Sequence, residues 1–260
     1  MSDALHIVTW NVNSLRARLE HVTRWIGDHR PDILCLQETK VPDDQFPAQA
    51  FADLGYEVAY HGQKTYNGVA IAARHPIEAV TLGFNGDGEE EQKRFMAATV
   101  QGIRVLNAYI PNGQTVDSPK FVYKLEFMQD MVRYLEQRHD KDEPLVLVGD
   151  FNVAPEAADV FSVEEMDGQI GFHPDERAAL ERLRDWGFHD AFRLFECGDG
   201  FYSWWDYRQG SFRRNRGLRI DHIWLTEPLQ RRANACWIDR EERARTKASD
   251  HAPVVAEIYA

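Results

Sequence analysis

Short apolar runs recur along the chain and alternate with segments of helical spacing. The runs have the length of strands and are rich in valine, isoleucine and leucine, which is typical of buried β-strands. We expect strands over residues 5–11, 33–37, 69–73, 96–100, 103–110, 145–148, 202–205, 218–225, 235–238 and 254–258.

The intervening segments predict helices. Over 14–29, Leu15, Leu19, Val22 and Ile26 fall on one helical face, and Pro31 follows the segment. Ser118 followed by Pro119 is a typical helix start, and that helix is expected to end near His139. A third helix is expected over 174–186.

Hairpins and strand–helix–strand units occur together in this pattern. Gln101-Gly102 is a turn signal between two expected strands, which predicts an antiparallel pair. The mixture favours mixed sheets over one parallel sheet. We find no linker rich in Pro, Gly or Ser, so residues 1–260 are expected to form a single domain, with acidic residues 86–92 in a surface loop.

Polar residues recur at the ends of the apolar strands. Those that come at or after the end of a strand are Asn11, Glu38, Asp150 and Asn152, whereas Asp221 lies inside a strand and Asp250 and His251 precede the last one. Each one alone is commonly a turn, a cap or a surface group. Their repetition indicates a ligand cleft beyond the strand ends, which is where α/β proteins often bind ligands.

The donor types favour one kind of chemistry. Carboxylate and amide oxygens without a Cys/His cluster suit Mg²⁺ or Mn²⁺ better than zinc. Carboxylates beside a histidine also activate water and orient a charged imidazole. Together these groups are suited to the hydrolysis of phosphate esters.

Composition and charge limit the kinds of binding partner that we expect for the chain. The chain has 260 residues, 43% of them hydrophobic, and a net charge of −12, so a packed core is expected and indiscriminate coating of nucleic acid is not. Residues 208–247 nevertheless hold 11 Lys and Arg residues and 5 Asp and Glu residues. This local positive excess indicates either a solvated face or a face for phosphate.

Targeting signals and cysteine usage indicate a compartment. We find no run long enough for a membrane span and no signal-peptide pattern at the first residues. The three cysteines are too scattered for a disulfide framework or a zinc site, and Cys35 is expected to be buried. We expect a cytoplasmic protein with no membrane contact.

Eight short segments together resemble the exonuclease III family of DNA-repair nucleases. This family (AP endonuclease family 1) belongs to the endonuclease/exonuclease/phosphatase superfamily. The segments are WNVNS (10–14), LQETK (36–40), YNGVA (66–70), YIPNG (109–113), GDFN (149–152), FYSWWDYR (201–208), GLRIDH (217–222) and SDHAP (249–253). They follow the family's order and cover nearly the whole chain.

The resemblance implies a fold and an activity. The fold would be a four-layer α/β sandwich, DNase I-like, with two mixed β-sheets packed together and flanked by helices. The activity would be Mg²⁺-dependent hydrolysis of phosphodiesters in double-stranded DNA, with Mn²⁺ as a substitute. It would combine the 3′–5′ exonuclease of exodeoxyribonuclease III with cleavage 5′ to abasic sites in base excision repair, by a monomer.

The resemblance also implies roles for individual residues. Glu38 would be the principal metal carboxylate, with Asn11 beside it and Asp250 assisting. Asp150 would orient or deprotonate the attacking water, and Asn152 would hold a phosphate oxygen. His251, paired with Asp221, would contact the scissile phosphate. Tyr109 would donate its hydroxyl to the phosphate or stabilise the leaving oxygen. The number of metal ions stays open.

A pocket for a baseless sugar is implied at Trp204, Leu218 and Ile220, although aromatic and apolar residues in such runs are more often core. Further substrate contacts are implied at Lys64, Tyr66, Asn67, Arg94, Asn112, Gly171, Arg213, Arg214 and Arg216. Any single arginine among them is also explained as a solvated surface group. Gln169 departs from the asparagine usual in such repair nucleases, which leaves open the balance between abasic-site cleavage and trimming of 3′ ends.

Two other functions are compatible with the same fold. One is a phosphatase acting on inositol phosphates or phospholipid, which shares the metal and histidine chemistry. The other is a nucleic-acid-binding regulator with a degraded site. The SWWDYR segment argues against the first, and the presence of all the implied catalytic groups argues against the second.

Overall fold

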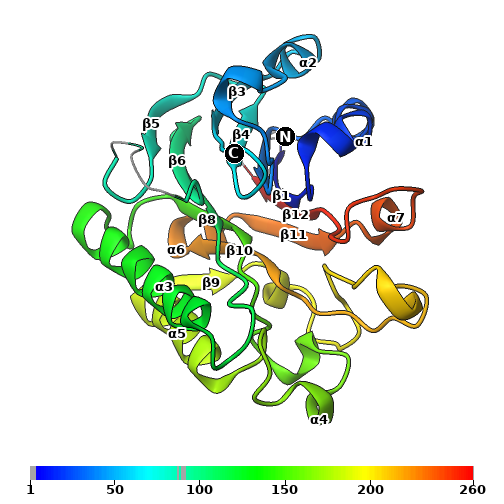
Figure 1. The fold of residues 1–260 in the computed structure, drawn as a ribbon. Coiled ribbons are helices and arrows are strands. Elements are labelled where there is room, and N and C mark those ends of the chain that lie inside the picture. Colours follow the sequence, from blue (N-terminus) through cyan, green and yellow to red (C-terminus); the bar gives the residue numbers. More distant parts are fainter. Residues whose placement is uncertain (1–3, 87, 89–91, 260) are drawn as a thin grey trace.

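Two six-stranded sheets form the centre of the protein (Figure 1). The computed structural model describes residues 4–86, 88 and 92–259. The first sheet has the strand order β11-β12-β1-β2-β4-β3, and the second has the order β5-β6-β7-β8-β10-β9. The strands are β1 Ala4–Asn11, β2 Ile33–Gln37, β3 Glu57–His61, β4 Val69–Ala73, β5 Glu78–Leu82, β6 Phe95–Val100, β7 Ile103–Tyr109, β8 Leu145–Asp150, β9 Phe188–Asp190, β10 Asp221–Thr226, β11 Ala233–Ile238 and β12 Val254–Tyr259.

Each sheet contains one parallel pair, and a long helix connects its two strands. β1 and β2 are parallel and joined through α1 Leu15–His29; β7 and β8 are parallel and joined through α3 Pro119–Arg138. A crossover of this kind is needed because parallel neighbours cannot be joined by a tight turn. The remaining helices are α2 Ala48–Ala52, α4 Val163–Met166, α5 Pro174–Trp186, α6 Glu227–Gln230 and α7 Arg240–Arg243.

The buried apolar residues form layers on both sides of each sheet. One cluster joins residues of β1, β2 and β4 to residues of β6, β7 and β8, and therefore fills the space between the sheets. A second cluster lies between the second sheet and helices α3 and α5. A third lies between the first sheet and helices α1 and α2. The order helix, sheet, sheet, helix confirms the four-layer sandwich.

Most of the expected elements are present. Strands 33–37 and 69–73 have the predicted limits, and the helices of 14–29, 118–139 and 174–186 are formed with ends shifted by at most a residue. Ser118 caps α3 as predicted, because its side chain accepts a hydrogen bond from Lys120 N at 3.0 Å. Cys35 is buried, and all three cysteines are free.

Two predicted strands are wrong in whole or in part. Residues 202–205 form no strand, and 218–225 shortens to β10, which begins at Asp221. Trp204 and Leu218 bond to each other as an isolated bridge, and Arg219 N donates to Asp159 O. Their backbone groups are thus satisfied by loops instead of by a neighbouring strand of the sheet.

The polar strand ends meet at one end of the sandwich. The carboxyl ends of β1 and β2 carry Asn11 and Glu38, and those of β7 and β8 carry Tyr109 and Asp150. β10 runs antiparallel to β8, so its first residue, Asp221, pairs with Asp150. β12 runs antiparallel to β1, so the loop preceding β12 also reaches this end.

Two expectations concern the surface and the membrane. The acidic segment 86–92 contains positions outside the described residues, so its expected loop is not tested. Within the described ranges, no helix combines the length and the apolar composition needed to cross a bilayer.

Candidate active site

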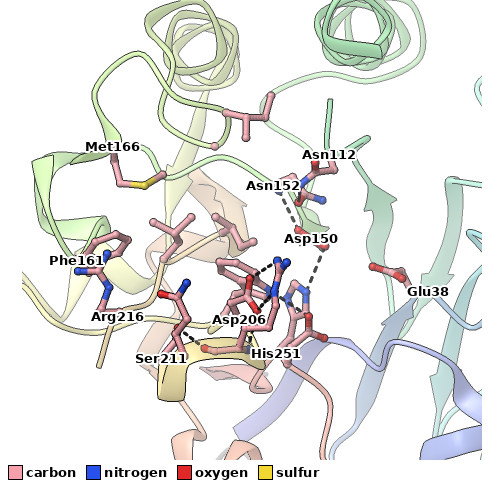
Figure 2. Close-up of a pocket in the computed structure, with 18 of the residues that line it drawn as sticks. Glu38, Asn112, Asp150, Asn152, Phe161, Met166, Asp206, Ser211, Arg216 and His251 are labelled. Atoms are coloured by element: carbon pink, nitrogen blue, oxygen red, sulfur yellow. Dashed lines mark hydrogen bonds and ion pairs between the residues drawn. The ribbon is translucent and has the colours of Figure 1, made fainter. Parts of the chain in front are cut away.

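A cavity of about 690 Å³ opens where the strand ends meet (Figure 2). We call it the main cavity. Its lining includes most of the residues predicted for catalysis and metal binding, namely Glu38, Tyr109, Asp150, Asn152, Asp250 and His251. Both sheets contribute to it, because Glu38 follows β2 and Asp150 ends β8.

Asn11 connects the carboxylates of the two sheets. Its side-chain nitrogen donates to Glu38 Oε1 and to Asp150 Oδ2, each at 2.8 Å. Its side-chain oxygen accepts from Asn13 N at 2.9 Å. In this arrangement the amide nitrogen of Asn11, and not its oxygen, faces the site. Asn11 therefore orients two carboxylates.

Glu38 has the properties of an ionised ligand. Burial raises the pKa of Glu38, but the adjacent Lys40 ammonium and the Asn11 hydrogen bond outweigh this and leave its pKa below the ordinary value. Lys40 Nζ lies 2.7 Å from Glu38 Oε2. The backbone of Glu38 has a φ of 52°, which is uncommon for a residue other than glycine and is frequent at functional sites.

His251 lies between two carboxylates. Its Nδ1 is 2.8 Å from Asp221 Oδ2, and its Nε2 is 3.8 Å from Asp150 Oδ2. Burial lowers the pKa of His251, but Asp221 and Asp150 outweigh burial and raise it well above its ordinary value. The imidazole is therefore charged near neutral pH. Asp221 is itself fixed, because its N–H and that of Ile220 donate to Ser203 Oγ.

Asp150 and Tyr109 both hold protons more strongly than usual. Burial, with the nearby charge of Asp221, raises the pKa of Asp150, although His251 opposes this effect. Burial and the charges of Glu38 and Asp150 raise the pKa of Tyr109, so its hydroxyl stays protonated. Arg94 lies over the Tyr109 ring, 4.5 Å from its centroid.

One compact group of side chains could hold a metal ion. A ligand atom from each of Glu38, Asp150 and His251 lies within 4.8 Å of the others. Two carboxylates fit a hard divalent cation, while a charged imidazole is suited to phosphate instead. Asp250 lies outside this group and accepts hydrogen bonds from Asn13 Nδ2 at 2.9 Å and Trp204 Nε1 at 3.0 Å.

Apolar side chains form the other wall of the main cavity. Leu218 and Ile220 are buried there in one cluster, with Trp204 packed against them. Gly171 also lines the cavity, at a φ of 85°. Trp205, in contrast, is a fully buried core residue. The residues expected to accept a baseless sugar therefore share one surface with the catalytic groups.

The expected DNA contacts are distributed over several surfaces. Asn112 and Arg216 line the main cavity, and Arg216 pairs with Glu165 at 2.7 Å. Tyr66, Asn67 and Arg94 line a neighbouring cleft of about 610 Å³, which shares Glu38, Tyr109 and Asn112 with the main cavity. Lys64 lines a smaller depression beside Lys40, and Arg213 and Arg214 are exposed.

The positive segment of the sequence does not form one positive face. Arg219 is fully buried between Asp159 and Asp190, and Arg231 pairs with Glu227 in α6. α6 follows β10, whose other end carries Asp221, so α6 lies at the end of the sheet away from the cavity. Of the basic residues in 208–247, Arg208 and Arg216 line the main cavity.

Several residues of the site were not predicted. Lys40 and Asp206 lie within two of the quoted motifs. The motifs therefore placed their segments near the site, but they did not predict which groups these two side chains contact. Phe161, Met166 and Ile170 complete the apolar wall, and they come from α4 and its flanking loops, where the sequence shows no repeating pattern. Lys124 contacts two of the site's loops and has no signal in the sequence.

Comparison with known proteins gives a consistent result. The family model described as the Endonuclease/Exonuclease/phosphatase family matches residues 8–251. The chain is 38% identical to exodeoxyribonuclease III of Haemophilus influenzae, over 97% of this chain and 99% of that protein. An AP endonuclease structure from Archaeoglobus fulgidus is 39% identical, with a TM-score of 0.92, and covers 98% of this chain and 99% of its own.

A second solved structure shows a related enzyme with its product. It is a variant of the 3′ phosphatase NExo from Neisseria, bound to a product DNA hairpin. The two chains are 41% identical, with a TM-score of 0.94, over 98% of this chain and all of the Neisseria chain.

Proposed function

The chain belongs to the exonuclease III and AP endonuclease family of the endonuclease/exonuclease/phosphatase superfamily, and from this premise we propose how its own residues cut DNA. It is a DNA-repair phosphodiesterase of that family, with a DNase I-like fold. The observation that carries the proposal is the bridge of Asn11 between Glu38 and Asp150, with His251 on the other side of Asp150.

Asp150 is the residue that orients the attacking water and takes its proton. Both of its oxygens are held by hydrogen bonds, Oδ2 by Asn11 and Oδ1 by the N–H of Asn152, so the carboxylate has a fixed position from which to orient a water. The water oxygen forms the new bond to phosphorus as the bond to the 3′ oxygen of the strand breaks. The protonated hydroxyl of Tyr109 stabilises the charge on the phosphate or on the leaving oxygen.

His251 and Asn152 hold the scissile phosphate. The charged imidazole of His251 has Nδ1 engaged with Asp221, so its Nε2–H is the donor that remains for a phosphate oxygen. The side chain of Asn152 supplies an amide on the opposite side of Asp150, as Figure 2 shows. Fixed donors around the phosphate stabilise the charge that develops in the transition state.

A divalent metal ion is part of this proposal, and we propose Mg²⁺, with Mn²⁺ as a substitute. Glu38 would be its principal ligand, with Asp150 beside it. Asp250, which is held by hydrogen bonds from Asn13 and Trp204, would assist at the metal side. When bound, the ion neutralises charge on a phosphate oxygen. The domain, residues 1–260, would act on double-stranded DNA as a monomer in the cytoplasm.

The apolar wall of the main cavity is the feature that would favour an abasic sugar over a nucleotide with its base. Trp204, Leu218 and Ile220 form a surface that suits a bare deoxyribose better than a nucleotide with its base, and Gly171 leaves room beside them. A missing base also lowers the cost of turning the sugar out of the duplex. Abasic sites and 3′ ends are therefore the proposed substrates.

Two labelled duplexes test this function. One carries a central abasic analogue and the other a recessed 3′ end. Cleavage 5′ to the abasic site and trimming of the 3′ end are expected with Mg²⁺, and both should stop with EDTA and return when Mg²⁺ is restored. Release of phosphate from an inositol polyphosphate assayed in parallel, without DNA cleavage, would instead favour a phosphatase. EDTA-sensitive cleavage excludes an inactive regulator.

A further inference from the structure

A lysine is enclosed directly behind the active site. Lys124 lies on α3, and its side chain has no exposed surface. Its Nζ donates to the backbone carbonyls of Asn112 at 3.2 Å and Asn152 at 2.7 Å, and it forms an ion pair with Glu176. An ammonium group has three N–H donors, so these acceptors occupy its whole hydrogen-bonding capacity.

The two carbonyls belong to the loops that follow β7 and β8. Asn112 Nδ2 donates to Asn152 Oδ1 at 3.1 Å, and Asn152 Nδ2 donates to Ile110 O at 3.0 Å. Asn152 N donates in turn to Asp150 Oδ1 at 2.9 Å. Figure 2 shows Asn112 and Asn152 next to each other above Asp150. Lys124 joins these loops from the side away from the cavity.

The backbone of Asn152 is held from several sides. Its φ is 52°, in the left-handed region, which asparagine adopts more readily than most residues because its side chain can bond locally. A conformation of this kind persists when the surroundings fix it from several sides. The bond from Lys124 to the Asn152 carbonyl is one of these constraints, and the bonds of the side-chain amide are the others.

Glu176 fixes the ammonium in place. This buried carboxylate belongs to the first turn of α5 and accepts a hydrogen bond from His173 N at 3.0 Å. Burial lowers the pKa of Lys124, and the charge of Glu176 opposes that effect. A buried ion pair is weak evidence of stabilisation, since an apolar pair of similar volume is often as stable. A role in positioning accounts for the pair better.

We propose that Lys124 is a positioning residue for phosphodiester hydrolysis. It holds the loops of Asn112 and Asn152 together so that the Asn152 amide meets the scissile phosphate. It acts through these loops and not on DNA, because its side chain has no exposed surface. The inference rests on the proposed role of Asn152 in binding phosphate.

The test is the double variant Lys124→Met/Glu176→Gln. It removes both buried charges together, and glutamine keeps an oxygen to accept the His173 N–H. We expect kcat on the abasic duplex to fall roughly 10- to 100-fold, because small misplacements of a catalytic group have effects of this size. KM should stay within about twofold, because the surface that meets DNA is unchanged. The Asn152 side-chain amide signals should shift or broaden in NMR spectra.

The matched control is Arg74→Met/Asp32→Asn. It removes another ion pair with a buried carboxylate, at the start of β2 and so at the opposite end of that strand from Glu38. This control is expected to melt at a lower temperature with the parental kcat. A folded Lys124→Met/Glu176→Gln protein with parental kcat and unshifted Asn152 signals would overturn the proposal.

Two further variants separate a failure of the Lys124 proposal from a folding defect and from a failure of the role proposed for Asn152. If the double variant does not fold, Lys124→Arg keeps the cation, but its planar group cannot repeat the three-way donation. A several-fold loss of kcat in Lys124→Arg supports the proposal, and parental kcat overturns it. Asn152→Ala is measured in parallel. Full activity of Asn152→Ala contradicts the proposed function of that residue, whereas an inactive Asn152→Ala beside fully active Lys124 variants contradicts only the present inference.

Discussion

The indole N–H of Trp204 donates a hydrogen bond to Asp250 Oδ2, and the two atoms are 3.0 Å apart. Trp204 is part of the apolar wall of the main cavity, while Asp250 directly precedes His251 in the chain. The wall proposed to meet the sugar and a carboxylate of the proposed phosphate site are therefore joined by one bond between side chains.

Replacement of Trp204 by phenylalanine tests this bond. The ring remains as a wall, but Asp250 loses one of its two side-chain donors. The bond fixes the orientation of Asp250 beside the proposed phosphate site, so its loss is expected to lower kcat/KM on the abasic duplex roughly tenfold. The measurement is steady-state cleavage beside Tyr202→Phe, a variant of a buried neighbour outside the cavity. Equal loss in both variants would mean that only packing matters.

Asp150→Asn removes the proposed proton acceptor with little change of shape. Asparagine has one side-chain oxygen, which can still accept from the N–H of Asn152 and so keep the loop in place, while its NH2 group replaces the oxygen that accepted from Asn11. Loss of general-base catalysis should lower kcat roughly 10²- to 10⁴-fold. Asp175→Asn, at an exposed position of α5, serves as the control. The assignment fails if purified Asp150→Asn cuts DNA at the parental rate.

Neutralisation of Arg213 and Arg214 should weaken DNA binding and reduce its dependence on salt. Both residues are exposed and lie in the chain between Ser211 and Arg216, which line the main cavity, whereas Arg216 is already paired with Glu165. Each lost phosphate contact lowers the slope of log K against log salt by about 0.9, so the glutamine double variant should lose up to about 2. Adding Arg216→Gln should change the slope less than either of the first two substitutions.

Arg231→Gln/Arg232→Gln is the matched control for charge. These residues belong to the same positive segment of the sequence but follow β10 at the end away from the cavity. We expect this variant to bind DNA with the parental salt dependence. Equal slopes for both double variants would show that overall charge, and not its location, governs binding.

Stability should fall in acid because His222 is buried in its neutral form. Its Nδ1 is 3.0 Å from Arg219 NH1, and its Nε2 is 2.9 Å from Val153 O. Burial and the Arg219 charge lower the pKa of His222 from 6.5 to about 4. The unfolded chain therefore binds the proton first as pH falls. Stability is lost between pH 6.5 and pH 4, by about 3 kcal/mol in total.

Urea unfolding at about pH 7 and about pH 4 measures this loss. His222→Gln is expected to lose less stability over the same interval than the parent protein. His189→Gln, in the neighbouring strand β9, should lose as much as the parent. A His222→Gln protein with the parental loss would show that other groups cause the acid sensitivity.

The sequence predicted the strand-end site well because strand polarity has a simple consequence. Asn11, Glu38 and Asp150 lie at the carboxyl ends of strands of the parallel pairs, and these ends meet because the two sheets pack together. His251 was also predicted from its place beside the last strand, whereas Tyr109 was predicted only from the resemblance. The structure adds what no motif states, namely that Asn11 uses its nitrogen to join two carboxylates.

The missed strands have a common cause. β3, β5 and β9 all lie at sheet edges, where one side of the strand has no partner and polar residues are tolerated. β5, for example, begins with an exposed glutamate and lacks the apolar run of a central strand. The burial of Lys124 was not predicted for another reason. A single lysine in an amphipathic helix is usually exposed, and only the packing of α3 against α5 and two loops reveals that it is enclosed.

The arrangement of the parallel pairs links activity to folding. Asn11 and Glu38 come from one sheet, and Tyr109 and Asp150 come from the other. His251 lies in the loop that precedes β12. In the proposed mechanism neither sheet alone supplies all the reacting groups. DNA cleavage by this mechanism therefore requires both sheets and the His251 segment to be folded together.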